Sequence, residues 1–183
     1  IQRNKNVRAQ LDQKYRQCAL DDHLRSVPLF ASLSQDFINY LRDRVELIRF
    51  SKGDVICRQG ELADSFYLVR IGFVKVTEEH RGGDLVLAYL GRGEFFGEMG
   101  LLGEGRRTAT CSALDHVEVV RIQAADFRVM MERYPSIRHD LETVARQRAA
   151  SKRPRLAPTA SGPPARLRGQ GLLGARSSVA AGV

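Results

Sequence analysis

The sequence predicts an α+β fold that is mainly β: a jelly-roll-like β-roll with helices before it and after it. Three observations support this prediction. Apolar residues recur with helical spacing over residues 1–44, they alternate with a period of two over residues 45–123, and helical spacing returns over residues 124–151. The strand-like runs are short and are separated by turn residues, a pattern typical of closed β structures.

The N-terminal lead-in, residues 1–44, has the pattern of two helices. Leu11, Tyr15 and Cys18 recur near helical spacing with charged residues between them, which predicts a helix over residues 1–26. The segment around Pro28 should end that helix, because proline lacks a backbone donor and restricts its neighbours. Ser34 can then cap a second helix, since it directly precedes a run with apolar residues at helical spacing.

The β-roll is predicted from short runs rich in β-branched and aromatic residues. The polar segment 78–84 is predicted to be a loop, and the segment 91–93 a turn that leads into a distinctive stretch at residues 95–111. Strands are expected at residues 45–50, 55–57, 65–70, 73–77, 85–90, 108–113 and 117–122.

Two helices should follow the roll. Residues 124–134 carry apolar residues at helical spacing, Pro135 stops that helix and can open the next, and residues 136–151 form an amphipathic stripe. Residues 152–183 are instead rich in proline and glycine and hold six basic residues and no acidic one. Such a segment buries too little apolar surface to offset its ordering entropy, so it is predicted to be a disordered, solvated basic tail.

The tail supplies a first testable prediction. Removal of residues 153–183 should leave the melting temperature and the ligand affinity of the protein nearly unchanged, because a segment of this composition makes few ordered contacts. Thermal unfolding of the full and shortened chains, side by side, measures the difference. A clear drop in melting temperature would show that the tail docks on the folded part.

Composition and residue spacing exclude several classes of function. Cys18, Cys57 and Cys111 are odd in number and far apart, and the four histidines are scattered, so neither a disulfide framework nor a metal site is expected. Reduced thiols, a polar N-terminal segment and the lack of a long apolar run predict a cytoplasmic chain without a membrane span. No general base or nucleophile is placed for catalysis, so an enzyme is not expected.

The stretch at residues 95–111 carries the strongest functional signal. Gly97 lets the backbone approach an anion closely, and a short apolar turn follows it. Glu98 offers a carboxylate that can accept hydrogen bonds from a ribose hydroxyl, and Arg107 offers a charged fork suited to phosphate. Phosphate donors and a sugar acceptor on one loop describe a site for a nucleotide. Arg106 has no such support and is predicted to be exposed.

These residues resemble the phosphate-binding cassette of the cyclic nucleotide-binding domain family, which occurs in cAMP-dependent kinase regulatory subunits, cyclic nucleotide-gated channels and catabolite activator-type regulators. Phe96-Gly97-Glu98 and Arg107-Thr108-Ala109-Thr110 match that cassette, and the segment from Leu24 to Ser34 resembles the family's helical lead-in. The resemblance implies a ligand, cAMP or cGMP, bound by Gly97, Glu98, Met99, Gly100, Arg107, Thr108 and Ala109. It also implies that the last helix is a lid over the base, with base-pocket candidates Ala88, Leu90, Leu141, Val144 and Arg148.

The implied function is a sensor domain that binds a cyclic nucleotide and moves its C-terminal helices. An apolar candidate pocket wall gives the extra polar edge of guanine few partners, which favours cAMP over cGMP. An effector domain or protein is implied as partner, and a homodimer is an open alternative, because apolar helices beside such a roll often pair.

Two alternatives from other classes stay open. The first is a non-binding structural or interaction copy of the domain. The second is a truncated cyclic nucleotide-dependent transcription regulator, although the roughly 30 residues after the lid are too short and too rich in proline and glycine for a winged helix-turn-helix, so nucleic-acid binding is not expected. A metal-dependent enzyme of the cupin type is a more distant third.

Overall fold

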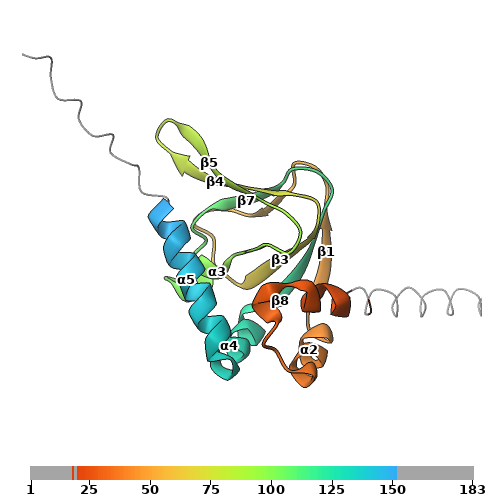
Figure 1. Ribbon diagram of the computed structural model, residues 1–183. Helices are drawn as coiled ribbons and strands as arrows, with labels where there is room; N and C mark the ends of the chain where they lie inside the picture. Colours follow the sequence, from red (N-terminus) through yellow and green to blue (C-terminus); the bar gives the residue numbers. More distant parts are fainter. Residues whose placement is uncertain (1–17, 19, 152–183) are drawn as a thin grey trace, which may run out of the picture. The chain divides into compact units, whose positions relative to one another are not determined.

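The computed structural model describes Cys18 and residues 20–151 (Figure 1). Residues 20–26 are helical and lead into a short 3-10 helix and a second α-helix, and two further helices follow the strands. The helices are η1 (Pro28–Phe30), α2 (Gln35–Arg42), α3 (Glu98–Leu102), α4 (Ala124–Arg133) and α5 (Pro135–Ser151). The strands are β1 (Glu46–Phe50), β2 (Val55–Cys57), β3 (Ser65–Ile71), β4 (Val74–His80), β5 (Gly83–Leu90), β6 (Phe95–Phe96), β7 (Thr110–Ala113) and β8 (Val117–Gln123).

The eight strands form two antiparallel four-stranded sheets, one with the order β1-β8-β3-β6 and the other with the order β2-β7-β4-β5. This arrangement, with helices before and after the roll, confirms the predicted fold class. The helical lead-in, η1 and α2 lie beside β8 and β3, whereas α5 runs along α3 toward the β4–β5 hairpin (Figure 1).

Strand β3 explains why the roll needs helices around it. Its successive residues point to opposite faces, and both faces are buried. Phe66 and Leu68 join a core with the helices, in which Phe37 and Phe127 also lie. On the other face, Tyr67 and Val69 join a second core between the two sheets. One strand therefore belongs to both apolar cores.

The second helix begins as the sequence predicts. The Ser34 side chain accepts a hydrogen bond from the backbone N–H of Phe37 at 3.3 Å, which caps α2. The hydroxyl of Tyr134, at the end of α4, lies 2.8 Å from the Ser34 hydroxyl. Tyr40 of α2 donates to Asp126 of α4 at 2.7 Å, so the first helices and the helices after the roll are joined by polar contacts as well as by packing.

The predicted loop at residues 78–84 is wrong. Strand β4 continues to His80, β5 begins at Gly83, and the two residues pair across a tight hairpin turn. The side chains of this hairpin face solvent, so their polarity is compatible with a strand whose backbone is fully paired. Gly83, with φ 116, adopts a backbone conformation that favours glycine at the turn. The short β6 and η1 were not predicted as separate elements.

Parts of other predictions fall outside the described residues. The first two-thirds of the helix expected at residues 1–26 and the basic tail at residues 152–183 are not described, so both stay predictions. The expected lack of nucleic-acid binding, which depends on the composition of that tail, stays a prediction too. Within the described part of the chain, no helix is long and apolar enough to cross a membrane.

His23, in the lead-in helix, is a buried titratable group with a testable effect on stability. Its side chain is only 2% exposed. Burial lowers the pKa of His23, and the Arg92 and Arg70 charges lower it further, whereas Glu118 acts in the opposite direction. The unfolded chain binds a proton at His23 more readily than the folded protein does. The contribution of neutral His23 to the free energy of unfolding is therefore fully present above the ordinary histidine pKa, and it is lost as the pH falls below that value.

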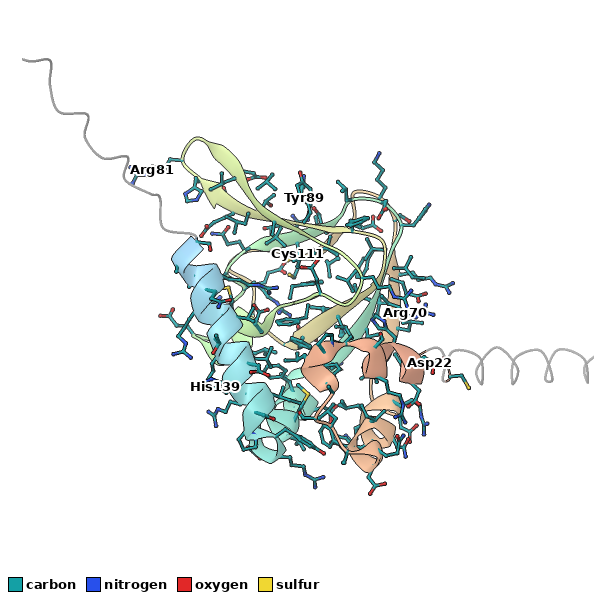
Figure 2. The ribbon with its side chains drawn as sticks, viewed as in Figure 1. Asp22, Arg70, Arg81, Tyr89, Cys111 and His139 are labelled. Atoms are coloured by element: carbon teal, nitrogen blue, oxygen red, sulfur yellow. The ribbon has the colours of Figure 1, made fainter. Side chains whose placement is uncertain are left out.

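We therefore expect the free energy of unfolding to decrease through this residue as the pH falls below the ordinary histidine pKa of 6.5. The variant His23→Leu should lose that part of the pH dependence in thermal or denaturant unfolding. His139→Leu is a matched control, since His139 is exposed on α5 (Figure 2). An unchanged pH profile in His23→Leu would contradict the assignment.

Candidate functional site

A pocket of about 330 Å³ lies where α3 and the end of α5 meet the sheet that contains β7 and β4. Its wall contains charged, small and apolar side chains from segments far apart in the sequence. The lining residues are Cys57, Val76, Leu87, Ala88, Leu90, Phe96, Gly97, Glu98, Met99, Gly100, Arg107, Thr108, Ala109, Cys111, Gln147, Arg148 and Ser151.

Gly97 makes the turn between β6 and α3 and must be glycine for two reasons. Its φ of 90 lies in the left-handed region. A Cβ at this position would also lie 2.6 Å from Nη1 of Arg107 and 3.0 Å from the carbonyl oxygen of Ser65. The same test at Gly100 places a Cβ 2.7 Å from the carbonyl oxygen of Arg106. Both glycines thus allow α3 to pack directly against the segment that carries Arg107.

Arg107 is held rigidly although it is charged. Its side chain is almost fully buried, and its Nη1 donates to the carbonyl oxygen of Ser65 at 2.7 Å. Its Nη2 donates to Oδ1 of Asp64 at 3.0 Å, while the Asp64 side chain is 68% exposed. The guanidinium also lies 5.3 Å from the centre of the Tyr67 ring. A buried, oriented guanidinium beside a cavity is suited to bind an anionic group.

Glu98 is the second charged group of the pocket and is only 1% exposed. Its Oε1 accepts a hydrogen bond at 2.7 Å from Nη1 of Arg148, which also donates to the carbonyl oxygen of Phe95 at 2.9 Å. Burial raises the pKa of the Glu98 carboxyl, and the Arg148 charge opposes that rise. Arg148 belongs to α5, so this ion pair joins the last helix to the pocket wall.

The structure brings most of the residues predicted for the site around this pocket. Ala88 and Leu90 of β5, Met99 of α3, and Thr108 and Ala109 before β7 all line it. The Thr108 hydroxyl donates to Sδ of Met99 at 3.7 Å. Arg106 is exposed, as predicted, and donates to the carbonyl oxygen of Gly60.

Two predicted pocket residues lie elsewhere. Leu141 is fully buried in the core between the helices and β3, and Val144 is half-buried; neither lines the pocket. Leu141 therefore packs in the helical core. Gln147 and Ser151 of α5 line the pocket together with Arg148, and helical spacing could have indicated Ser151, because it lies three residues after Arg148 and four after Gln147.

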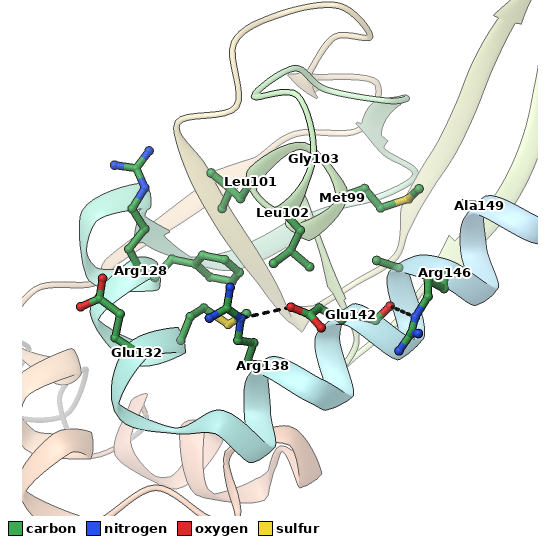
Figure 3. Close-up of a pocket in the computed structure, with 13 residues that line it drawn as sticks. Met99, Leu101, Leu102, Gly103, Arg128, Glu132, Arg138, Glu142, Arg146 and Ala149 are labelled. Carbon is green, nitrogen blue, oxygen red and sulfur yellow. Dashed lines mark hydrogen bonds and ion pairs between the residues drawn. The ribbon is translucent and has the colours of Figure 1, made fainter.

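A second, larger groove of about 640 Å³ lies on the other side of α3 (Figure 3). It is lined by Leu101 and Leu102 of α3 and by Phe127 and Met131 of α4. Charged residues of α4 and α5 form its rim, and there Arg138 pairs with Glu142 at 3.1 Å. The helix that begins at the pocket wall thus has open space on the side that faces α4 and α5.

The described residues offer no chemistry for a metal ion. No group of three or more histidine, cysteine, aspartate or glutamate side chains in this part of the chain could hold one. What the pocket does provide is a buried arginine and a buried glutamate on either side of a glycine turn, beside apolar strands. This arrangement can bind an anionic group and a hydroxyl-bearing group of one small molecule.

A sequence model of the cyclic nucleotide-binding domain family matches residues 47–134 of the chain. The matched segment runs from β1 to the end of α4 and includes the pocket wall from Gly97 to Cys111. Helix α5, which carries Arg148, lies outside it.

The chain spans only part of the length of the relatives that it resembles. The chain is 34% identical over 128 residues to isozyme 2 of the cGMP-dependent protein kinase of Drosophila melanogaster, which covers 68% of the chain and 14% of the kinase. It is 32% identical over 126 residues to the cyclic AMP receptor protein of Thermus thermophilus, and the match covers 68% of this chain and 58% of that protein. The solved regulatory domain of Toxoplasma gondii PKA with cAMP superposes with a TM-score of 0.67 and 26% identity, over 73% of this chain and 51% of that one.

Proposed function

Because this chain belongs to the cyclic nucleotide-binding domain family, we propose that it is a sensor domain that binds a 3′,5′-cyclic nucleotide. The observation that supports this most is the pocket that places Glu98 and Arg107 together, both almost fully buried. Its relatives are named for cGMP in one case and for cyclic AMP in another. The proposed role is ligand binding and regulation, without catalysis.

The two buried charges have separate tasks in this proposal. Arg107 binds the cyclic phosphate, which takes over a contact now made to Asp64, a residue exposed enough to turn into solvent. Glu98 accepts a hydrogen bond from the ribose 2′-hydroxyl while it keeps or exchanges its contact with Arg148. Gly97 and Gly100 allow the backbone to approach the ligand without a Cβ in the way.

Helix α5 is the proposed moving part. Of the α5 residues that line the pocket, Arg148 is the charged one, and it links the helix to the pocket wall. Leu141 of the same helix lies in a core that also contains residues of α4. When the phosphate draws in the turn at Gly97, α3 moves, and Leu102 shifts toward Phe127 across the open groove. The ligand then biases an equilibrium between two positions of α5 by its different affinity for them.

One observation favours the alternative, a copy of the domain that binds no nucleotide. Within the pocket wall, Glu98 is paired with Arg148, and Arg107 is paired with Asp64 and with the carbonyl oxygen of Ser65. A pocket whose charges are satisfied internally is stable without a ligand. A ligand must replace at least the contact between Arg107 and Asp64, and the loss of that contact is a cost that its binding has to exceed.

Isothermal titration of the full chain with cAMP and with cGMP separates the two candidates. Saturable binding of either nucleotide with one site per chain supports the sensor. No heat and no rise in melting temperature at millimolar concentrations of both would favour the non-binding copy. Linear adenosine 5′-monophosphate is the matched control ligand, because it carries the same base and sugar without the cyclic phosphate.

The base preference gives a further prediction. The wall near the base is formed by apolar Ala88 and Leu90, which leaves guanine's polar edge few partners, so we expect cAMP to bind at least as tightly as cGMP. The Thr108 hydroxyl can reach a guanine amino group when that base is syn. Thr108→Ala should therefore reduce the affinity for cGMP more than that for cAMP, in parallel titrations. If wild-type protein bound cGMP tenfold tighter than cAMP, the expected preference would be wrong, and Arg148 would be the next residue to test.

A further inference from the structure

Two cysteines of the pocket wall lie directly opposite each other. Cys57 ends β2, Cys111 lies in β7, and the two residues are partners in the antiparallel register of these strands, next to an irregularity in β2. Directly opposed residues of antiparallel strands have Cα atoms about 4.5–5.5 Å apart and side chains on the same face. That separation lies within the range that a disulfide bond can bridge.

Both thiols are inside the protein but reach the pocket. Cys57 and Cys111 are 6% and 4% exposed, and both line the cavity that also contains Arg107. Figure 2 shows Cys111 within the roll. A peroxide molecule is small enough to enter a pocket of about 330 Å³, so the thiols are shielded from large reagents and open to small oxidants.

The two thiols also differ in acidity. The side-chain hydrogen bond with Cys111 lowers the pKa of Cys57, and the Arg107 charge lowers it further, whereas burial and Glu61 act in the opposite direction. The same hydrogen bond, together with burial, raises the pKa of Cys111, while the Arg107 charge lowers it as it does for Cys57, so the hydrogen bond makes the difference. Cys57 is therefore the thiol with more thiolate character, and Cys111 is its partner.

We propose that Cys57 and Cys111 form a redox-sensitive dithiol in the pocket wall, which a hydroperoxide oxidises to an intramolecular disulfide. The Cys57 thiolate attacks a peroxide oxygen, the O–O bond breaks, and a sulfenic acid forms while the other oxygen leaves as water or alcohol after taking up a proton. The Cys111 sulfur then attacks the sulfenic sulfur, the S–O bond breaks, and water leaves. Overall, two thiols lose two electrons and two protons, and the peroxide is reduced.

The disulfide would tie together two segments that already hold the arginine. The backbone N–H of Gln59, after β2, donates to Oγ1 of Thr110 at 3.0 Å. The backbone N–H of Gly60 donates to the carbonyl oxygen of Arg107 at 2.8 Å. A disulfide at Cys111, the residue that follows Thr110, would restrain this region. The oxidation state of Cys57 and Cys111 would therefore affect the part of the pocket that carries Arg107.

The direct test uses the full chain with Cys18→Ser, since Cys18 is exposed and would form disulfides between molecules. Treatment of the folded protein with dilute hydrogen peroxide should remove both remaining free thiols and reduce the intact mass by two hydrogens. Peptide mapping without reductant should find Cys57 linked to Cys111, and reductant should release them. Thiols that stay free while those of the urea-unfolded protein react, or oxidation to sulfinic acid without a linkage, would overturn the proposal.

Single variants provide a second readout that does not depend on peptide mapping. In the Cys18→Ser background, Cys111→Ser should form a sulfenic acid at Cys57, which intact mass measures as a gain of one oxygen, whereas Cys57→Ser should react with peroxide much more slowly. Oxidation of Cys111 in Cys57→Ser without oxidation of Cys57 in Cys111→Ser would contradict the assigned order of the two thiols.

A ligand arm tests the location of the dithiol and relies on the proposed function. A saturating cyclic nucleotide should slow disulfide formation at least tenfold, because the ligand fills the space through which the peroxide reaches the thiols. Equal rates with a ligand shown to be bound would mean that the thiols are reached by another route. The first two experiments need no nucleotide, so they decide on the disulfide even if the protein binds none.

Discussion

Replacement of Arg107 by alanine should weaken cyclic nucleotide binding by about 10²-fold, because a charge-assisted contact to phosphate in a partly desolvated site contributes roughly 2–4 kcal/mol. The geometry makes this residue the strongest candidate for the phosphate contact. Its guanidinium is buried and oriented by Ser65, Asp64 and the Tyr67 ring before any ligand arrives. Titration of the variant with the nucleotide that the wild-type protein binds measures the loss.

The neighbouring Arg106 is the matched control. It has the same charge and lies one position away, but it is exposed and donates only to the carbonyl oxygen of Gly60 among the contacts described here. Arg106→Ala should therefore change the affinity by less than about threefold. Equal losses for the two variants would contradict the assignment of the phosphate site.

A third variant separates charge from geometry. Arg107→Lys keeps the positive charge but loses the planar fork that contacts Ser65 and Asp64 at once, so it should bind with an affinity between wild type and Arg107→Ala. Because Arg107 is buried, circular dichroism at the titration temperature should establish that each variant is folded.

Replacement of Arg148 by methionine should lower the free energy of unfolding at neutral pH by about 2 kcal/mol, because it leaves the Glu98 carboxylate buried without its ionic partner. Methionine keeps much of the apolar stem of arginine, so the loss reports mainly on the charge. Denaturant unfolding of the ligand-free protein measures it. Arg146→Met is the control: Arg146 lies in the same helix but is exposed and bonds only within the helix, to Glu142 and Thr143.

The pH dependence of this loss gives a second readout. Burial holds the pKa of Glu98 above the ordinary value of 4.5, and removal of Arg148 takes away the charge that opposes this rise. A carboxyl whose folded pKa is raised stabilises the protein at low pH and loses that contribution as the pH increases through the folded pKa. The difference in the free energy of unfolding between wild type and Arg148→Met should therefore become smaller as the pH falls toward 4.5. A gap that stays constant with pH would mean that the loss comes from packing.

The sequence was most informative where the determinants are local. Gly97, Glu98 and Arg107 lie within one short stretch, and the chemistry of each residue type indicates its place without knowledge of the fold. Ser34 is another example, because a helix cap is decided by the next few residues. The polar β4–β5 hairpin was missed for the opposite reason: its strands are set by pairing with each other and with β7, which local polarity does not report.

Contacts between distant segments could not be predicted from spacing. Arg148 was a candidate for the base pocket, but its ion pair with Glu98 depends on how α5 crosses the roll. Leu141 lies two turns earlier on nearly the same side of the helix, and it is buried in the helical core because of that same crossing. The pairing of Cys57 with Cys111 depends on strand register, and an irregularity next to Val55 shifts that register, so the sequence alone indicated only scattered cysteines.

Strand β3 has a consequence for how this protein opens. Since Phe66 and Leu68 belong to one core and Tyr67 and Val69 to the other, neither core can lose its packing without exposing a strand that the other still needs. The helices and the sheets are thereby coupled into one cooperative unfolding unit. Amide protons of β3 should exchange with solvent only through global unfolding, while those in the last turn of α5, near Ser151, should exchange through small local openings. The end of α5 can therefore open and change position often, while the two cores joined by β3 stay folded.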